Sequence, residues 1–308
     1  MQTSILNLSY HAAVNPALWI GSSSWSEKAW SGPFYPAGVR PADYLRYYAT
    51  RFPAVEADTT YYRVPSRDLV RGWDTKTPAG FRLSAKFPRA IVHAGVGPSP
   101  DGERVLVPEH VQRETDAFLE GMGFMGPKCG PLVLQFPYFN RTAFADRAPF
   151  LERLDRYLGN LPKEFRYVVE IRNKAWFDEE FLDLLRRHSA APCLLDLLYM
   201  PHPLELSKTL NLVTTDFAYA RLIGDRKAVN RLTNHLDHIV IDQSKRIASW
   251  GELLSDLVPG VKETFAFCNN HFAGFAPATI ADLAQVAQEK GLHVQAAKAS
   301  RSPDTLFD

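Results

Sequence analysis

The chain has 308 residues, of which 46% are hydrophobic and 22% are charged, a composition that supports a large core and excludes a disordered protein. Its 35 basic and 34 acidic residues give a formal net charge of +1, so no overall field draws it to nucleic acid or to an anionic membrane. Nucleic acid therefore stays open as a partner only through a local basic patch.

The cysteines and the N-terminal segment indicate the compartment. Cys129, Cys193 and Cys268 lie far apart, and none has a spacing that holds zinc or an iron–sulfur cluster. The opening MQTSILNLSYHAAVNP lacks the basic start and apolar middle of a signal peptide, and no apolar run approaches the roughly 18 residues of a membrane span. We therefore expect a cytoplasmic protein that does not enter a membrane.

Eight short apolar runs alternate with amphipathic segments along the chain. They fall at 18–23, 54–58, 81–86, 131–136, 166–172, 192–196, 217–222 and 263–268. Eight strand–helix units predict an α/β fold, a (β/α)8 TIM-like barrel, although an open doubly wound sheet shows the same alternation. No linker divides the chain, so we expect a single domain over 1–308, with long strand–helix loops, a barrel core of about 18–293 and flexible tails at both ends.

The amphipathic segments predict the helices. Pro41, Pro108 and Pro277 stand where proline is favoured, in the first turn of a helix. We expect helices at 41–52, 66–76, 108–123, 143–158, 178–188, 240–257 and 277–290. The stretch 89–107, which contains GVGPSPDGE, is interpreted as one long loop after the third strand.

Active sites of parallel barrels form at the carboxyl ends of the strands, and this sequence has many polar residues there. The apolar neighbours of Glu56 and Glu170 predict that both carboxylates point into the barrel, because alternate residues of a strand share a face. The candidate site residues are Trp25, Glu56, Asp58, Tyr61, Lys86, Gln135, Glu170, Arg172, Asp196, Arg221, Asn269, Asn270 and His271.

This mixture of bases and carboxylates is typical of a site that binds an anion and moves protons. Glu170, Glu56 and Lys86 are the candidate catalytic residues, and the others are candidates for substrate binding. The expected ligand is a small phosphorylated or carboxylated molecule, and the expected reaction is hydrolysis or elimination. Ion pairs that merely fill a polar barrel interior are the alternative for each charge alone, but burying so many charges at one end is costly.

Glu170 is the preferred proton-transfer residue because it shares a strand face with Arg172. The guanidinium would keep the carboxylate ionised, as a general base requires. Burial beside Trp176 and Phe177 would instead raise its pKa and suit an acid. The sequence leaves the balance between these two effects open.

Two other functions fit the same residues. Glu56 and Glu170 are a candidate carboxylate pair for a glycosidase, with aromatic residues at the strand ends stacking on a sugar. A non-catalytic barrel that holds a nucleotide or single-stranded nucleic acid is the other alternative. No cofactor and no resident metal are evident. A divalent metal that accompanies a phosphorylated substrate stays open, as does the oligomeric state.

Several segments carry a resemblance to a known family: WIGSSSWSEKAWSGPFYP, VEADTTYYRVPS, TPAGFRLSAKFPRAIVH, GPLVLQFP, VVEIRNKAWF and NNHFAGFAP. In them the chain resembles the YecE-like family, domain of unknown function family 72. The resemblance implies a TIM-like barrel in a single bacterial-type domain, with no agreed activity. Two residues depart from the family pattern: Ile223 replaces the histidine of an Arg-x-His-Gly run, and Tyr61 stands where phenylalanine is usual. If that histidine takes part in chemistry, this chain has an altered activity or substrate.

Overall fold

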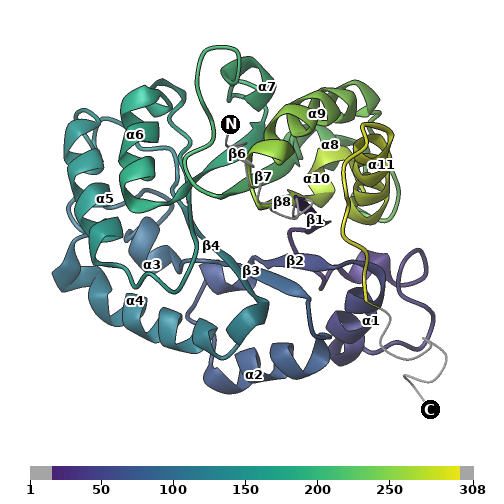
Figure 1. Cartoon of the computed structure of the whole chain (residues 1–308). Helices are drawn as coiled ribbons and strands as arrows, with labels where there is room; N and C mark the ends of the chain where they lie inside the picture. Colours follow the sequence, from purple (N-terminus) through teal and green to yellow (C-terminus); the bar gives the residue numbers. More distant parts are fainter. Residues whose placement is uncertain (1–15, 299–308) are drawn as a thin grey trace, which may run out of the picture.

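Eight parallel strands close into one barrel in the computed structural model, which describes residues 16–298 (Figure 1). Each strand pairs with its neighbours in sequence, and β8 pairs with β1 along its whole length. The predicted (β/α)8 TIM-like barrel is therefore confirmed, and the open sheet is excluded. The strands are β1 Ala17–Ser22, β2 Ala54–Ala57, β3 Arg82–Lys86, β4 Cys129–Gln135, β5 Tyr167–Glu170, β6 Ala191–Leu197, β7 Phe217–Gly224 and β8 Glu263–Cys268.

Helices surround the barrel on the outside (Figure 1). They are α1 Tyr44–Arg51, α2 Arg67–Lys76, α3 Arg89–Val92, α4 Pro108–Gly123, α5 Ala148–Asn160, α6 Glu179–His188, α7 Pro203–Leu206, α8 Arg226–Leu232, α9 Ser244–Leu257, α10 Asn270–Ala273 and α11 Ala276–Glu289. Short 3-10 turns are η1 Lys28–Trp30, η2 Pro41–Asp43, η3 Thr59–Tyr61, η4 Gly126–Lys128, η5 Lys174–Trp176 and η6 Val258–Gly260. The seven predicted helices are all present, and their bounds differ by a few residues at most.

The sequence did not predict α3, α7, α8 and α10. Each is at most two turns long, which is too short for a 3.6-residue periodicity to show. The interpretation of 89–107 as one loop is wrong at its start, because α3 occupies Arg89–Val92.

Side chains of the strands alternate between the barrel interior and the surrounding helices. Every second residue points inward, so one apolar cluster fills the barrel and a second, larger one lies between the strands and the helices. The inner cluster includes Trp19, Val133, Val168, Tyr219 and Phe265.

Ion pairs and aromatic rings fill the amino-terminal end of the barrel. Arg82 and Arg166 pair with Glu263, which also accepts a hydrogen bond of 3.0 Å from the indole of Trp19. The guanidinium of Arg82 lies 4.7 Å from the centre of the Trp19 ring, a cation–π contact. Because this end is filled, the carboxyl ends of the strands are the place for a ligand.

The flexible tails predicted at both ends of the chain lie outside the described residues. Within residues 16–298, no helix combines the length and the apolar character that a bilayer crossing requires.

Candidate functional site

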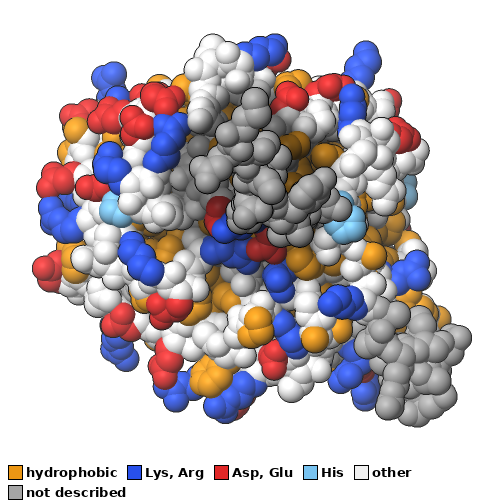
Figure 2. Space-filling view, in the orientation of Figure 1, with side chains coloured by type: hydrophobic (Ala, Val, Ile, Leu, Met, Phe, Trp, Pro, Cys, Tyr) orange, Lys and Arg blue, Asp and Glu red, His pale blue; other side chains and the backbone are white. Residues whose placement is uncertain are grey.

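Four strands place charged side chains inside the barrel at its carboxyl end. Glu56 of β2, Lys86 of β3, Glu170 of β5 and Arg221 of β7 are all buried. The space-filling view shows basic and acidic side chains close together at the centre of the face (Figure 2). We call these four residues and Arg172, which follows β5, the charged cluster.

Arg221 lies at the centre of the charged cluster. Its guanidinium pairs with Glu170, its Nε lies 3.0 Å from Glu56 Oε2, and its Nη1 donates a hydrogen bond of 2.8 Å to Gln135 Oε1. Tyr219, two residues earlier on the same strand face, donates from its hydroxyl to Glu56 Oε2 at 2.8 Å. Because Arg221 is only 2% exposed, it bridges the two carboxylates rather than reaching a ligand. Tyr219 was not among the residues predicted from the sequence, although its spacing of two from Arg221 puts it on the same inward face.

Glu170 is fully buried between two arginines. Arg172 donates through Nε at 2.9 Å and approaches through Nη2 at 2.8 Å, both to Oε1, while Arg221 holds Oε2. Burial acts to raise the pKa of Glu170, but the two guanidiniums outweigh it and hold the pKa at about 2. A carboxylate this acidic stays ionised near neutrality and is a weak base. Its geometry fits a residue that positions the arginines better than the proton-transfer role expected from the sequence.

Lys86 pairs with the second buried carboxylate, Glu56. The distance from Lys86 Nζ to Glu56 Oε1 is 3.2 Å. Burial opposes ionisation of Glu56, but Arg221 and Lys86 outweigh it and lower its pKa. Burial, together with the nearby Arg221, lowers the pKa of Lys86. Within residues 16–298 this ion pair is the one polar side-chain contact of the ammonium, so N–H donors remain for a ligand.

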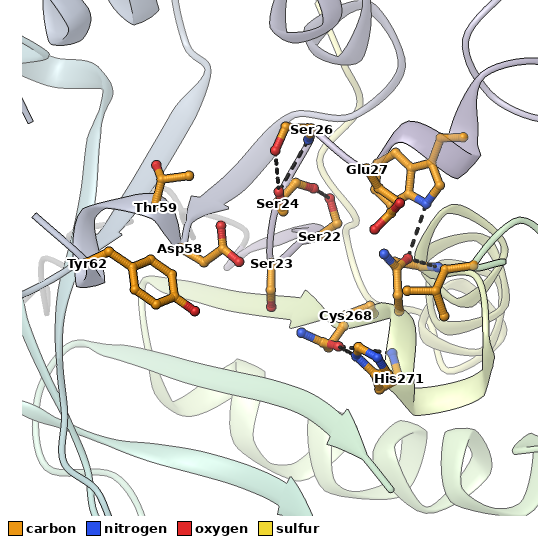
Figure 3. A pocket seen from close by; sticks show the side chains of 15 residues that line it. Ser22, Ser23, Ser24, Ser26, Glu27, Asp58, Thr59, Tyr62, Cys268 and His271 are labelled. Carbon is orange, nitrogen blue, oxygen red and sulfur yellow. Dashed lines mark hydrogen bonds between the residues drawn. The ribbon is translucent and has the colours of Figure 1, made fainter. Parts of the chain in front are cut away.

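Asp58, at the end of β2, lies between the charged cluster and a neighbouring pocket. Burial raises the pKa of Asp58, and Lys86 opposes that shift. The pocket has a volume of about 320 Å³ and is formed by the ends of β1, β2 and β8 (Figure 3). We call it the serine pocket; its polar lining is Ser22, Ser23, Ser24, Ser26, Glu27, Asp58, Thr59, Tyr62, Asn269, Asn270 and His271.

The turn after β8 holds two asparagines and a histidine in fixed orientations. Asn269 Oδ1 accepts a hydrogen bond of 2.9 Å from the backbone N–H of His271 and lies 3.0 Å from His271 Nδ1. Asn270 Oδ1 accepts from the indole of Trp30 at 3.2 Å and from the backbone N–H of Ala276 at 3.0 Å. The structure thus places all three residues at the serine pocket.

Asp196 does not join the charged cluster, contrary to the expectation from the sequence. Leu195 points into the barrel, so Asp196 faces the helices. Its fully buried carboxylate pairs with Arg246 of α9 and accepts a hydrogen bond of 2.9 Å from the indole of Trp250. His202 Nε2 lies 3.6 Å away. Asp196 therefore attaches α9 to β6 and has no position for substrate binding.

Replacing Asp196 with alanine is expected to lower the free energy of unfolding by about 1–3 kcal/mol, because the buried indole N–H of Trp250 loses its acceptor. Urea unfolding measures the loss. Asp183→Ala, which removes an exposed partner of Arg186 on α6, is the control and should change the free energy by less than about 0.5 kcal/mol. Equal effects of the two substitutions would contradict the structural role of Asp196.

Trp25 and Tyr61 have different positions relative to the charged cluster. Trp25 packs edge-on against Trp73, with 5.7 Å between ring centres, and lines a separate pocket of about 190 Å³. It therefore lies outside both the cluster and the serine pocket. Tyr61 is half-buried; burial raises its pKa, and Arg172 is near enough to oppose the shift.

Most aromatic residues near the strand ends belong to the core. Trp30, Tyr35 and Phe272 are fully buried, so their rings offer no surface for stacking on a ligand. Arg221 occupies the space between Glu56 and Glu170, which leaves no room for a sugar between those carboxylates. The pairing suggested for a glycosidase therefore has no support in the geometry. Within residues 16–298, no three His, Cys, Asp or Glu side chains form a group that could hold a metal ion.

Sequence comparison identifies a family that matches nearly the whole chain. The pattern of the family described as "Protein of unknown function DUF72" matches residues 19–304. The chain belongs to this family. The UPF0759 protein YecE of Escherichia coli strain K12 is 31% identical over 160 residues, 52% of this chain and 50% of that protein. The chain thus spans about half the length of the curated relatives it matches.

Solved structures of DUF72 proteins share the fold. One from Thermotoga maritima is 25% identical, with a TM-score of 0.62, and the match covers 88% of this chain and 99% of that one. Another, from Enterococcus faecalis, is 21% identical, with a TM-score of 0.64, and covers 92% of this chain and 99% of that one. The second likeness concerns the fold alone.

Ile223, one of the two departures expected from the family resemblance, follows Arg221 on β7. Ile223 shares the inward face of β7 with Arg221 and packs against the barrel interior, so the side chain at this position is apolar. The next residue, Gly224, has φ +74°, and a Cβ there would lie 2.5 Å from Phe272 Cα. Glycine at this position lets α10 approach β7 and carry His271 to the pocket.

Proposed function

We propose that this DUF72 protein is an enzyme that binds a small phosphorylated or carboxylated substrate at the carboxyl end of its barrel. The proposed reaction class is hydrolysis or elimination with proton transfer. The supporting observation is that Lys86 and Arg172 each pair with one carboxylate oxygen and keep N–H donors that these ion pairs do not use.

Lys86 and Arg172 are the proposed ligands of the anion. Lys86 contacts one oxygen of Glu56, and both contacts of Arg172 go to a single oxygen of Glu170. Each therefore keeps N–H donors that these pairs do not use. The Arg172 side chain is 27% exposed, so solvent and small ligands reach it. A charged ligand oxygen would accept these donors in short, charge-assisted hydrogen bonds.

Lys86 and Asp58 are the proposed proton-transfer residues. Burial shifts their pKa values in opposite directions, downward for Lys86 and upward for Asp58. Both shifts move the pKa towards neutral pH, and a proton-transfer residue is most effective when its pKa lies near the pH at which the enzyme works. Glu56, Glu170 and Arg221 hold Lys86 and Arg172 in place, and we count these three as positioning residues.

Thermal unfolding with inorganic phosphate tests the anion site. A ligand that binds the folded state raises its stability by about 2.7 kcal/mol at a concentration near 100 times Kd, so Tm should rise by about 5 °C or more. Lys86→Met and Arg172→Met should each remove most of this rise, whatever their own Tm. Lys208→Met, which alters an exposed pair on the surface, should keep it. A Tm that is the same in phosphate and in sodium chloride of equal ionic strength would disprove the anion site.

A further inference from the structure

We infer that the serine pocket binds the hydroxyl groups of the substrate, which makes the substrate a phosphorylated or carboxylated sugar. This inference rests on the proposed anion site and adds the chemical class of the rest of the molecule. It is carried by the hydrogen-bonding groups that the pocket presents and by a buried serine hydroxyl that has no hydrogen-bond partner within residues 16–298.

Two carboxamides supply donors to the pocket. Asn269 and Asn270 each accept a backbone N–H through Oδ1, and a backbone N–H can bond only to the oxygen of an amide. This fixes the orientation of both side chains, so their NH₂ groups are known to lie on the opposite side from these contacts. Within residues 16–298, neither NH₂ group has a hydrogen-bond partner. Both are therefore available to ligand oxygens.

His271 supplies an acceptor. Because Asn269 Oδ1 can only accept, the 3.0 Å contact requires that His271 Nδ1 carries the proton. Neutral imidazole then has a lone pair on Nε2. Burial lowers the pKa of His271 and favours this neutral form. A hydroxyl group can donate to Nε2 while it accepts from a neighbouring amide.

Ser23 and Asp58 lie on the other side of the pocket (Figure 3). Ser23 is 4% exposed, and its Oγ has no hydrogen-bond partner among the described residues. A buried hydroxyl without a partner is costly unless a ligand or water completes it. Asp58 is half-buried and adds a carboxyl group to the same wall.

This combination of groups selects against other ligand classes. An anion alone needs donors and would be repelled by the Asp58 carboxylate and by the lone pair of His271 Nε2. An apolar group would leave the amides, the serine and the imidazole unsatisfied. Adjacent hydroxyl groups of a sugar donate and accept at once, and therefore satisfy both kinds of group. The volume of about 320 Å³ is at the lower end of the range for small-molecule pockets.

Asp58 links the serine pocket electrostatically to the proposed anion site. Asp58 lines the pocket, and its pKa responds to Lys86 and Glu56 of the charged cluster. The inferred substrate places its hydroxyl groups in the serine pocket and its anionic group at Lys86 and Arg172. Asp58, which lines the pocket, follows the strand that carries Glu56, the partner of Lys86.

Calorimetric binding to the full chain tests the inference. The probes are inorganic phosphate, glyceraldehyde 3-phosphate, ribose 5-phosphate, glucose 6-phosphate and gluconate. At least one sugar anion should bind 10-fold or more tightly than phosphate, as expected for about two added hydrogen bonds. Ser23→Ala should weaken the binding of that sugar anion about 5-fold and leave the affinity for phosphate unchanged. The Tm of this variant without ligand should not fall, because Ser23 Oγ makes no hydrogen bond to any described residue that the substitution would remove.

Ser84→Ala is the matched control. Ser84 Oγ is also buried and has no hydrogen-bond partner in the described part of the chain, but it lies on β3 and does not line the serine pocket. This variant should bind every probe like the unmutated protein. The inference is overturned if no sugar anion binds more tightly than phosphate, or if Ser23→Ala has no larger effect than Ser84→Ala. A failure of the proposed anion site looks different: Lys86→Met and Arg172→Met would leave binding of the sugar anion unchanged while Ser23→Ala still weakens it.

Discussion

Replacing Arg221 with methionine is expected to lower the free energy of unfolding by about 3–5 kcal/mol, because Glu56 and Glu170 would stay buried without their shared partner. Both carboxylates are fully buried, so water cannot compensate for the lost charge. For a protein of this size the loss corresponds to a fall in Tm of about 10 °C. Thermal and urea unfolding of the purified variant measure both quantities.

Two further variants show that the loss comes from unpaired charge. Arg67→Met removes an arginine from an exposed pair with Glu120, and should change the free energy of unfolding by less than about 1 kcal/mol. Adding Glu56→Gln and Lys86→Met to Arg221→Met should restore most of the lost stability, because Glu170 keeps Arg172 as its partner and no other charge of the cluster stays buried. If the triple variant is no more stable than Arg221→Met alone, loss of packing volume explains the defect instead.

The inward faces of several strands could be predicted because polar and apolar residues alternate along them. Glu56 stands between Val55 and Ala57, and only one face of β2 can therefore hold the carboxylate. The same pattern places Lys86 on the face of β3 opposite to Leu83 and Ala85. Where the alternation was clear, the sequence and the structure agree on the direction of the side chain.

The direction of Asp196 could not be predicted in the same way. The residues before it on β6 are apolar on both faces, as is usual for a strand covered by helices on one side and by barrel interior on the other. The sequence therefore contains no alternation that shows which face Asp196 occupies. Its partners Arg246 and Trp250 come from α9, about 50 residues later, and only the packed fold brings them near.

The protonation behaviour of Glu170 was also beyond local sequence patterns. The sequence placed Arg172 beside it, but the second guanidinium, from Arg221, comes from a strand two positions further around the barrel. With one arginine alone, the lowering of the Glu170 pKa by that charge and the raising of it by burial could not be ranked. Two arginines, each in direct contact, decide it in favour of the ionised form.

Glu170 should therefore make the stability of the protein depend on pH in the acidic range. Its pKa is about 2 in the folded protein and about 4.5 when the residue is unperturbed. Between these values the unfolded chain binds more protons, so the stabilisation is complete above about pH 5 and is lost as the pH falls towards 2. A shift of this size corresponds to about 3 kcal/mol. Glu56, whose pKa is also lowered, adds to the same trend.

Glu170→Gln isolates the contribution of the ionised Glu170 to the pH dependence of stability. At pH 7 the variant should be less stable than the unmutated protein by about 3 kcal/mol, and the difference should shrink towards zero as the pH approaches 2, where the glutamate is protonated as well. Urea unfolding at a series of pH values measures the difference. Glu120→Gln, at an exposed pair, is the control and should stay within about 1 kcal/mol of the unmutated protein at every pH. A difference for Glu170→Gln that is constant with pH would show that shape and packing, not the charge held by Arg221 and Arg172, explain the loss.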